Sequence, residues 1–174
     1  MAQQGLQRGS KSFLTRYIFS MDHKVIGKQY FITAVVMAII GGILAMLIRI
    51  ELAWPGAKIG WLSKLIPGGF EDGVMKPEFY VSLFTMHGTI MVFFVLSLAP
   101  ISGFGNFIVP LQIGARDMAS PLLNMLSYWT LVPGCIIIII SFFVEGGAAA
   151  SGWTAYPPLS ALKKAIPGSG LGQT

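Results

Sequence analysis

Three uncharged stretches, each long enough to cross a lipid bilayer, dominate the pattern of apolar and polar positions along the chain. They lie between Lys28 and Arg49, between Glu78 and Arg116, and between Asp117 and Glu145. The hydrocarbon core of a bilayer is about 30 Å thick, and about 20 apolar helical residues are needed to cross it. The pattern therefore predicts an all-α integral membrane protein with three transmembrane helices, over residues 29–50, 78–110 and 121–145.

Composition supports a membrane protein. The 174 residues are 54% hydrophobic and 11% charged, whereas about a quarter of the residues in soluble domains are charged. This composition argues against a soluble enzyme and against a disordered chain. The 12 Lys and Arg residues outnumber the 7 Asp and Glu residues, and their excess is gathered near the N-terminus. That distribution is typical of the positive-inside bias of membrane proteins and not of a nucleic-acid-binding patch.

The same charge bias predicts an orientation. It makes residues 1–28 a cytoplasmic N-terminal segment, 51–77 an outer loop, 111–120 a cytoplasmic loop and 146–174 an outer tail. The first apolar stretch is too long for a cleaved signal peptide, and no small-residue cleavage site follows it. We expect a multi-pass protein of a bacterial inner membrane, with its N-terminus in the cytoplasm.

Prolines and glycines interrupt the second predicted helix. Pro100 and Pro110 each lack a backbone donor, so a tilt, a kink or an early end near Pro110 is expected. Between them, the sequence SGFGN lets another helix or a flat cofactor approach the backbone closely. Gly41 and Gly42 in the first helix allow the same two interpretations.

His87 lies within the second predicted helix, where an ionisable side chain is rare. About nine residues at 1.5 Å each put it about 13 Å from the outer end, too deep for the imidazole to reach water. A polar group at this depth must find a partner, so His87 either hydrogen-bonds another helix or binds a metal. A haem needs only one axial imidazole from each face, and the second ligand can come from a helix distant in sequence.

Two charged residues mark the outer end of the first helix. Arg49 is either an anchor that reaches the interface or a fixed cation that tunes a cofactor lying between the helices. Glu51 follows in the sequence ELAWPG, where a carboxylate and a turn carbonyl can hold a hard cation such as calcium or sodium.

An acid and two amides are expected at the cytoplasmic end. Asp117 lies between the second and third helices, and Asn106 and Asn124 lie on the helices that flank it. They form either an ordinary solvated surface or the start of an ordered file of water, along which protons enter a dry interior.

The other candidate ligands are weaker. Cys135 is the only cysteine and lies in an apolar run, so it cannot form an internal disulfide or a CxxC site and is expected to be buried. His23 precedes the first helix, and we expect it to be a surface or capping residue.

Six motifs, taken in order and spacing, resemble the N-terminal part of cytochrome c oxidase subunit I. They are SMDHKVIG, LIRIEL, TMHGTIMVFF, GFGNFIVPLQIGARDMASP, LNMLSYW and GWTAYPPLS. The resemblance implies the first three helices of the twelve-helix haem-copper oxidase bundle. It also implies a terminal respiratory oxidase that reduces oxygen to water and pumps protons, with cytochrome c as electron donor.

The resemblance implies roles for three residues around a low-spin haem, expected to be haem a. His87 in TMHGTIM matches one of its two axial ligands, and Arg49 in LIRIEL matches the arginine that hydrogen-bonds the haem formyl group and raises its potential. Trp153 in GWTAYPP resembles the tryptophan near the haem propionates. A haem with two axial imidazoles has no open position for oxygen, so it relays electrons.

The resemblance also implies a proton pathway. Asp117 in GARDMA matches the acid at the entrance of the D pathway, and Asn106 and Asn124 match asparagines of its lower water chain. Leu122 departs from the family, which often has an arginine at this position.

A structural calcium or sodium site of the family falls at Glu51 and Gly56. The match is incomplete, because Trp54 and Lys58 occupy places where some relatives have ligands, and a cation at Lys58 opposes ion binding.

The family's remaining ligands lie in later helices, outside this sequence. These are the second low-spin haem ligand, the ligands of the high-spin haem and copper, and the cross-linked tyrosine. The expected partners are therefore the remaining part of subunit I, oxidase subunits II and III, cytochrome c or quinol, and membrane lipid, with no nucleic acid. Two alternatives stay open: a quinol oxidase subunit I, or a haem-free membrane assembly fragment in which His87 only hydrogen-bonds another helix.

Overall fold

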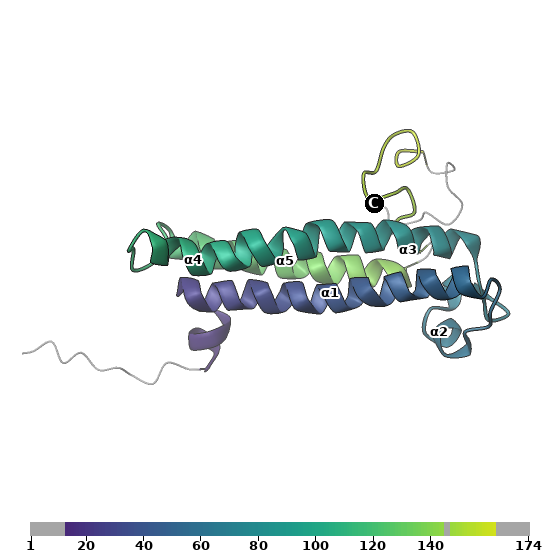
Figure 1. The fold of residues 1–174 in the computed structure, drawn as a ribbon, viewed down its shortest axis with the longest axis horizontal. Coiled ribbons are helices and arrows are strands. Elements are labelled where there is room, and N and C mark those ends of the chain that lie inside the picture. The colour runs from purple at the N-terminus through teal and green to yellow at the C-terminus, as the bar shows by residue number, and fades with distance from the viewer. Residues whose placement is uncertain (1–12, 145–146, 163–174) are drawn as a thin grey trace, which may run out of the picture.

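Three long helical rods packed side by side make up most of the computed structural model, which describes residues 13–144 and 147–162 (Figure 1). The rods are His23–Ala53, with 31 residues and a mean hydropathy of 2.7, Pro77–Gln112, with 36 and 1.9, and Pro121–Phe143, with 23 and 2.0. Each is long and apolar enough to cross a membrane. The predicted fold class, an all-α integral membrane protein with three spanning helices, is confirmed.

The first rod is a single helix, α1 (His23–Ala53). It begins before residue 29 because the Asp22 carboxylate caps its N-terminus, accepting the main-chain N–H of Lys24 at 2.8 Å. Lys24 and Lys28 are exposed in the first turns, which the uncharged stretch therefore does not include. The buried positions of α1 recur every three or four residues along one face. They include Ile26, Tyr30, Ala34, Met37, Gly41, Leu44 and Ile48.

The second rod changes helix type along its length. It consists of α3 (Pro77–Thr89), the π-helices η3 (Ile90–Leu96) and η4 (Leu98–Phe104), and α4 (Gly105–Gln112). Pro100 lies inside η4 and Pro110 inside α4, and the helix ends at Gln112. In η4 the N–H of Ser102 reaches the carbonyl of Ser97 at 3.4 Å. These wider turns shift the hydrogen-bond pattern around Pro100, so the rod continues past a residue that has no N–H to donate.

The third rod consists of α5 (Pro121–Ile140) and a final 3₁₀ turn, η5 (Ser141–Phe143). Two apolar clusters join the rods, and α1 contributes to both. The larger cluster lies toward the loop that joins the first two rods and includes Met37, Leu83 and Ile90, whereas the smaller one gathers Ile26 and Tyr30 at the opposite end. Cys135 is 6% exposed within the larger cluster, so its predicted burial is confirmed.

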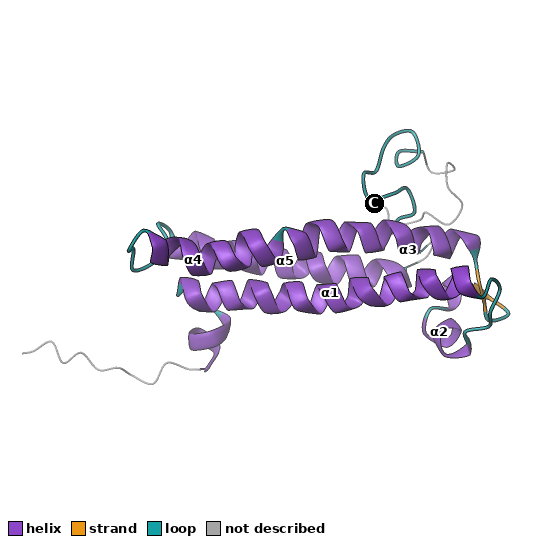
Figure 2. Ribbon diagram, in the orientation of Figure 1, coloured by secondary structure: helices purple, strands orange, loops and turns teal. Residues whose placement is uncertain are grey.

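The loop between the first two rods is folded. It contains α2 (Gly60–Leu65), the 3₁₀ turn η2 (Pro67–Gly69) and the antiparallel strands β1 (Phe70–Glu71) and β2 (Val74–Met75) (Figure 2). Asp72 and Gly73 form the two-residue turn with φ of 51° and 84°, as a tight hairpin requires. Phe70 and Met75 are buried and close the end of the larger apolar cluster.

The segment before α1 is tied to two rods. It forms a short π-helix, η1 (Leu14–Ile18). The Gln29 amide of α1 donates hydrogen bonds to the carbonyls of Tyr17 and Ile18, at 2.7 and 2.9 Å. The indole N–H of Trp129 in α5 also donates to the Ile18 carbonyl, at 3.1 Å. Side-chain donors from α1 and α5 therefore hold this segment at the end where α1 begins.

Candidate functional site

His87 joins the first two rods through its imidazole. It lies near the end of α3 and is half-buried, and its Nδ1 is 2.9 Å from the main-chain carbonyl oxygen of Gly41 in α1. Because a carbonyl can only accept, Nδ1 carries the proton and donates this bond. The neutral imidazole then has its lone pair on Nε2, the atom that binds a metal when Nδ1 donates to a backbone carbonyl.

Gly41 makes this contact possible because it has no side chain. A Cβ built there would lie 2.8 Å from Met91 Sδ and 3.3 Å from Ile90 Cγ2. At Gly42, by contrast, a Cβ would have no neighbour within 4 Å. Of the two adjacent glycines, Gly41 thus allows α1 to approach η3 closely, and this close approach brings its carbonyl to His87.

Trp153 packs on Gly88, the residue that follows His87 in α3. A Cβ built on Gly88 would be 3.0 Å from Cδ1 of the Trp153 indole, and the rings of Trp153 and Phe93 meet edge to face with centroids 6.4 Å apart. The indole is 49% exposed. The structure therefore seats Trp153, which follows the third rod, on the residue of the second rod that comes directly after His87.

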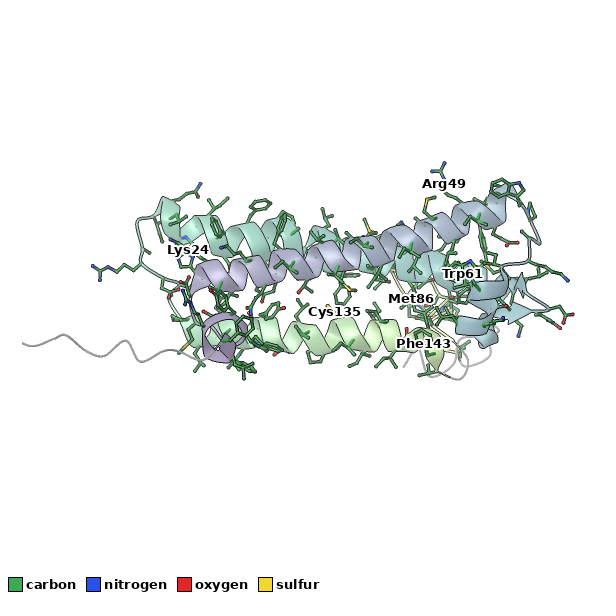
Figure 3. All side chains as sticks on the ribbon, turned by 90° about the horizontal axis from the view of Figure 1, so that it is seen from below. Lys24, Arg49, Trp61, Met86, Cys135 and Phe143 are labelled. Carbon is green, nitrogen blue, oxygen red and sulfur yellow. The ribbon has the colours of Figure 1, made fainter. Side chains whose placement is uncertain are left out.

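Arg49 is not brought to the imidazole. It lies eight positions after Gly41 on α1, about 12 Å farther along the helix axis. Its side chain is exposed and points away from the rods near the end of α1 that leads into the loop with α2, while Lys24 lies at the opposite end of α1 (Figure 3). No hydrogen bond joins Arg49 to His87 among the described residues.

Glu51 closes the turn that follows α1. Its Oε1 accepts the main-chain N–H of Gly56 at 3.0 Å, and Gly56 has the positive φ of 75° that favours glycine. Its Oε2 is buried and has no hydrogen-bond partner. Among residues 13–144 and 147–162, no group of three or more His, Cys, Asp or Glu side chains could hold a metal ion, so a cation at this turn would depend on main-chain oxygens.

His23 is buried at the opposite end of α1. It is 2% exposed, and its Nδ1 is 2.9 Å from the main-chain oxygen of Asn106. The expectation of a surface or capping residue is therefore wrong, because Asp22 is the cap and the imidazole lies between α1 and α4. Close packing encloses it, since a Cβ on Gly27 would lie 3.0 Å from the carbonyl oxygen of Gly103. At Gly103, the SGFGN sequence serves helix packing.

Two asparagines, the buried Asn106 and the half-buried Asn124, each have one buried amide atom without a partner at this end. Asn106 is 8% exposed, and its Nδ2 donates to the Ser102 carbonyl at 2.7 Å. Its Oδ1 is buried without a hydrogen-bond partner, and so is the Nδ2 of Asn124. Buried polar atoms are seldom left unpaired, so each of these two atoms is a candidate to hydrogen-bond a water molecule.

Two pairs of hydroxyl groups link α1 to α5 beyond Asn124. Ser127 donates to the Asn124 carbonyl at 2.7 Å and lies 2.8 Å from the Tyr30 hydroxyl of α1. One turn along α1, the hydroxyls of Thr33 and Tyr128 are 3.1 Å apart. These pairs were not predicted from the sequence. Their signal was polar residues three positions apart within an apolar helix, on α1 and again close together on α5.

Asp117 lies in the loop between α4 and α5, at the same end as these asparagines. It is half-buried, and its Oδ1 accepts the main-chain N–H of Met118 at 2.8 Å. That bond fixes the carboxylate at the end of the rods where Asn106 and Asn124 have unpaired atoms.

The described residues thus define a class: a multi-pass helical membrane protein with a half-buried imidazole whose Nε2 makes no hydrogen bond, and with buried, unpaired amide atoms at one end. A family model described as "Cytochrome C and Quinol oxidase polypeptide I" matches residues 25–172. The chain belongs to this family, and the resemblance found in the sequence is confirmed.

Named relatives agree with the family match. The chain is 40% identical over 93% of its length to the "Alternative cytochrome c oxidase subunit 1" of Bradyrhizobium diazoefficiens. It is 42% identical over 84% to the "Cytochrome c oxidase subunit 1" of Thermostichus vulcanus, and 39% identical over 94% to the "Heme-copper oxidase subunit I+III" of Aeropyrum pernix. The matches cover 25%, 23% and 18% of those proteins. The chain therefore spans about a quarter or less of the length of these relatives.

Proposed function

We propose that this chain is the first part of the catalytic subunit of a terminal respiratory oxidase. It supplies one axial ligand of a low-spin haem and the entrance of a proton pathway, in oxygen reduction to water coupled to proton pumping. The observation that carries the proposal is the 2.9 Å hydrogen bond from Nδ1 of His87 to the Gly41 carbonyl. Because Nδ1 donates this bond, Nε2 is the ring nitrogen left to bind a metal, as when a histidine holds a haem iron.

The residues around His87 fit a haem. Nε2 has no hydrogen-bond partner among the described residues, and about half of the Trp153 side chain, which packs on the adjacent Gly88, remains exposed and available to a flat apolar group. When bound, a haem with two axial imidazoles supplies one-electron transfer without an open position for oxygen. His87 would hold the iron, and the Gly41 carbonyl would fix the ring orientation and raise the basicity of the ligand.

Arg49 is proposed to tune the same haem, which we expect to be haem a, from the outer end. A guanidinium is always charged, and its positive charge disfavours the oxidised, more positive state of a nearby haem. In the described residues it points away from the bundle, so the proposed contact with the haem would form on the side of α1 that faces away from the other rods.

Asp117 is proposed as the proton entrance. From its carboxylate, protons would pass to water held by the unpaired Oδ1 of Asn106 and Nδ2 of Asn124, and then along the hydroxyls of Ser127 and Tyr30. Groups that both accept and donate hydrogen bonds can hand protons along such a chain without charged side chains in the apolar interior.

We also propose a calcium or sodium site at Glu51 and Gly56. The buried, unpaired Oε2 of Glu51 is the available anionic ligand, and oxygen ligands are what these cations prefer. The exposed Lys58 nearby in sequence opposes it by charge.

Other parts of the oxidase would complete the site. The proposed partners are the remaining part of subunit I, which carries the second low-spin haem ligand and the high-spin haem and copper ligands, and oxidase subunits II and III. Cytochrome c is the proposed electron donor, in a bacterial inner membrane with the N-terminus in the cytoplasm. The name of the matching family covers quinol oxidases as well, so quinol is the alternative donor.

The experiment is an absorption spectrum of the assembled oxidase carrying His87→Ala. The low-spin haem band should disappear, while His23→Ala, a second buried histidine bonded to a main-chain carbonyl, should keep it. A His87→Ala complex with its full haem spectrum would refute the ligand assignment and favour the haem-free alternative.

A further inference from the structure

The outer segment after the third rod is docked on α3 by one side-chain hydroxyl. Oγ1 of Thr85 accepts the main-chain N–H of Gly152 at 3.0 Å. Thr85 is 4% exposed, and residues on the segment side are also buried, with Ala148 2% and Ala150 3% exposed. A segment far from α3 in the sequence is therefore seated on the turn of α3 that precedes His87, as the yellow loop over α3 shows (Figure 1).

The Thr85 hydroxyl has a defined direction because it makes two bonds. It donates to the Val81 carbonyl one turn back, at 3.2 Å, which places its hydrogen. Its lone pair is then free to accept from Gly152. Serine and threonine often bond to the preceding turn of their own helix in this way, but here the same oxygen also receives a donor from a segment 67 positions away.

Two glycines complete the docking. Gly152 has a φ of 87°, which side-chain-bearing residues rarely adopt, and this conformation turns the chain so that the next residue, Trp153, faces α3. Gly88 leaves the space that the indole uses, since a Cβ there would lie 3.0 Å from Cδ1 and 3.3 Å from Cβ of Trp153. Thr85, Gly152 and Gly88 together hold the Trp153 indole on the turn of α3 that contains His87.

We propose that Thr85 is a positioning residue: its hydroxyl fixes the Gly152 main chain and thereby holds the Trp153 indole over Gly88, the residue that follows His87. Without the hydroxyl, the Gly152 N–H loses its acceptor and the indole loses its anchor. The proposal rests on the proposed function only where it concerns the haem, because the docking itself needs no cofactor. In the assembled oxidase, the indole would then exclude water from the outer edge of the haem that His87 holds.

The test compares Thr85→Val, which keeps the shape and removes the hydroxyl, with Thr85→Ser, which keeps the hydroxyl. Thr89→Val is the matched control, because Thr89 also donates to a main-chain carbonyl of α3, at 2.8 Å to Thr85, but has no bond to the outer segment. Hydrogen exchange of the peptide that contains Gly152 should quicken about five- to tenfold in Thr85→Val, the factor that a lost hydrogen bond corresponds to. It should stay at the wild-type rate in Thr85→Ser and Thr89→Val.

The second readout is the midpoint potential of the low-spin haem. Water replacing the indole stabilises the more charged oxidised state, so the potential should fall in Thr85→Val and in Trp153→Ala, with no further fall when the two are combined. Thr85→Ser should restore it.

Three results would overturn the proposal. They are unchanged exchange at Gly152 in Thr85→Val, a haem potential that moves in Trp153→Ala but not in Thr85→Val, and additive shifts in the double variant. If Thr85→Val does not assemble, Thr85→Ala is measured against Thr85→Ser with the same expectations. An oxidase with no haem on His87 would refute the proposed function, while the exchange rates would still decide whether Thr85 docks the segment.

Discussion

Gly41 and Gly42 are adjacent residues of α1 with opposite surroundings, so alanine at each position separates helix propensity from packing. At Gly42 a Cβ meets nothing within 4 Å. Gly42→Ala should therefore raise stability by up to about 1 kcal/mol, the difference in helix propensity between the two residues. At Gly41 a Cβ would lie 2.8 Å from Met91 Sδ and 3.3 Å from Ile90 Cγ2.

Gly41→Ala has the same gain in propensity, but it must also displace its neighbours. Inserting a methyl group into a packed contact costs about 1–3 kcal/mol. The flexible Met91 side chain can move, whereas the β-branched Ile90 has fewer rotamers to use. The net change should lie between neutral and a loss of about 2 kcal/mol. Relative to Gly42→Ala, the variant should be about 1–3 kcal/mol less stable.

The functional consequence follows from the hydrogen bond that Gly41 accepts. If α1 moves away from η3 to make room, the 2.9 Å contact between Nδ1 of His87 and the Gly41 carbonyl lengthens. A weaker bond makes the imidazole a less basic ligand, which favours the oxidised iron less. The midpoint potential of the low-spin haem should therefore rise in Gly41→Ala and stay unchanged in Gly42→Ala.

Both effects can be measured on the assembled oxidase, by redox titration of the low-spin haem band and by its thermal loss at one fixed scan rate. Equal potentials and equal thermal midpoints in the two variants would refute the reasoning. Such a result would mean that Gly41 is not where α1 and the second rod touch, or that its carbonyl does not act on His87.

Three further predictions concern the opposite end of the bundle. Asp117→Asn should slow proton uptake about 10²-fold or more, the lower range of what a positioned proton-transfer group contributes, and undiminished pumping in reconstituted vesicles would argue against the entrance. Gly27→Ala should cost about 1–3 kcal/mol of stability, because its Cβ would lie 3.0 Å from the rigid main chain at Gly103. Gly105→Ala, with open space around it, is the control. Equal thermal unfolding midpoints of the two variants would contradict the close packing at Gly27. Tyr30→Phe removes the hydroxyl that faces Ser127 and should slow proton uptake while leaving the haem spectrum intact, so a normal uptake rate would exclude the hydroxyl from the path.

The rods were predictable because crossing a bilayer demands apolar helices of a minimum length, which hydropathy records directly. The structure at the ends of the rods was less predictable. The start of α1 is set by the Asp22 cap. Its first turns contain Lys24 and Lys28, so an uncharged stretch does not include them and predicts too late a start. The π-helical turns around Pro100 arise from local backbone geometry, which has no strong pattern in the sequence. The hairpin between the first two rods was predictable in principle, because its turn is the Asp72-Gly73 pair that favours two-residue hairpins.

The same distinction applies to the candidate site. His87 was recognisable because an imidazole deep in an apolar helix needs a partner. The hydrogen-bond partner of His87 was not recognisable from the sequence. It is the main-chain carbonyl of Gly41, a group that every residue has, and only the packing of α1 on η3 selects it. The burial of His23 was missed for a related reason, since the enclosing contacts come from Gly27 and Gly103, which leave no side-chain signal.

The central claim is that Nε2 of His87 holds a haem iron while Nδ1 donates to Gly41. A cryo-electron-microscopy map of the assembled oxidase tests it most directly. The account predicts porphyrin density whose iron lies on Nε2 of His87, with Nδ1 still within hydrogen-bond distance of the Gly41 carbonyl. A map with the iron on another side chain, or with His87 bonded only to a neighbouring helix and no porphyrin against it, would contradict the account.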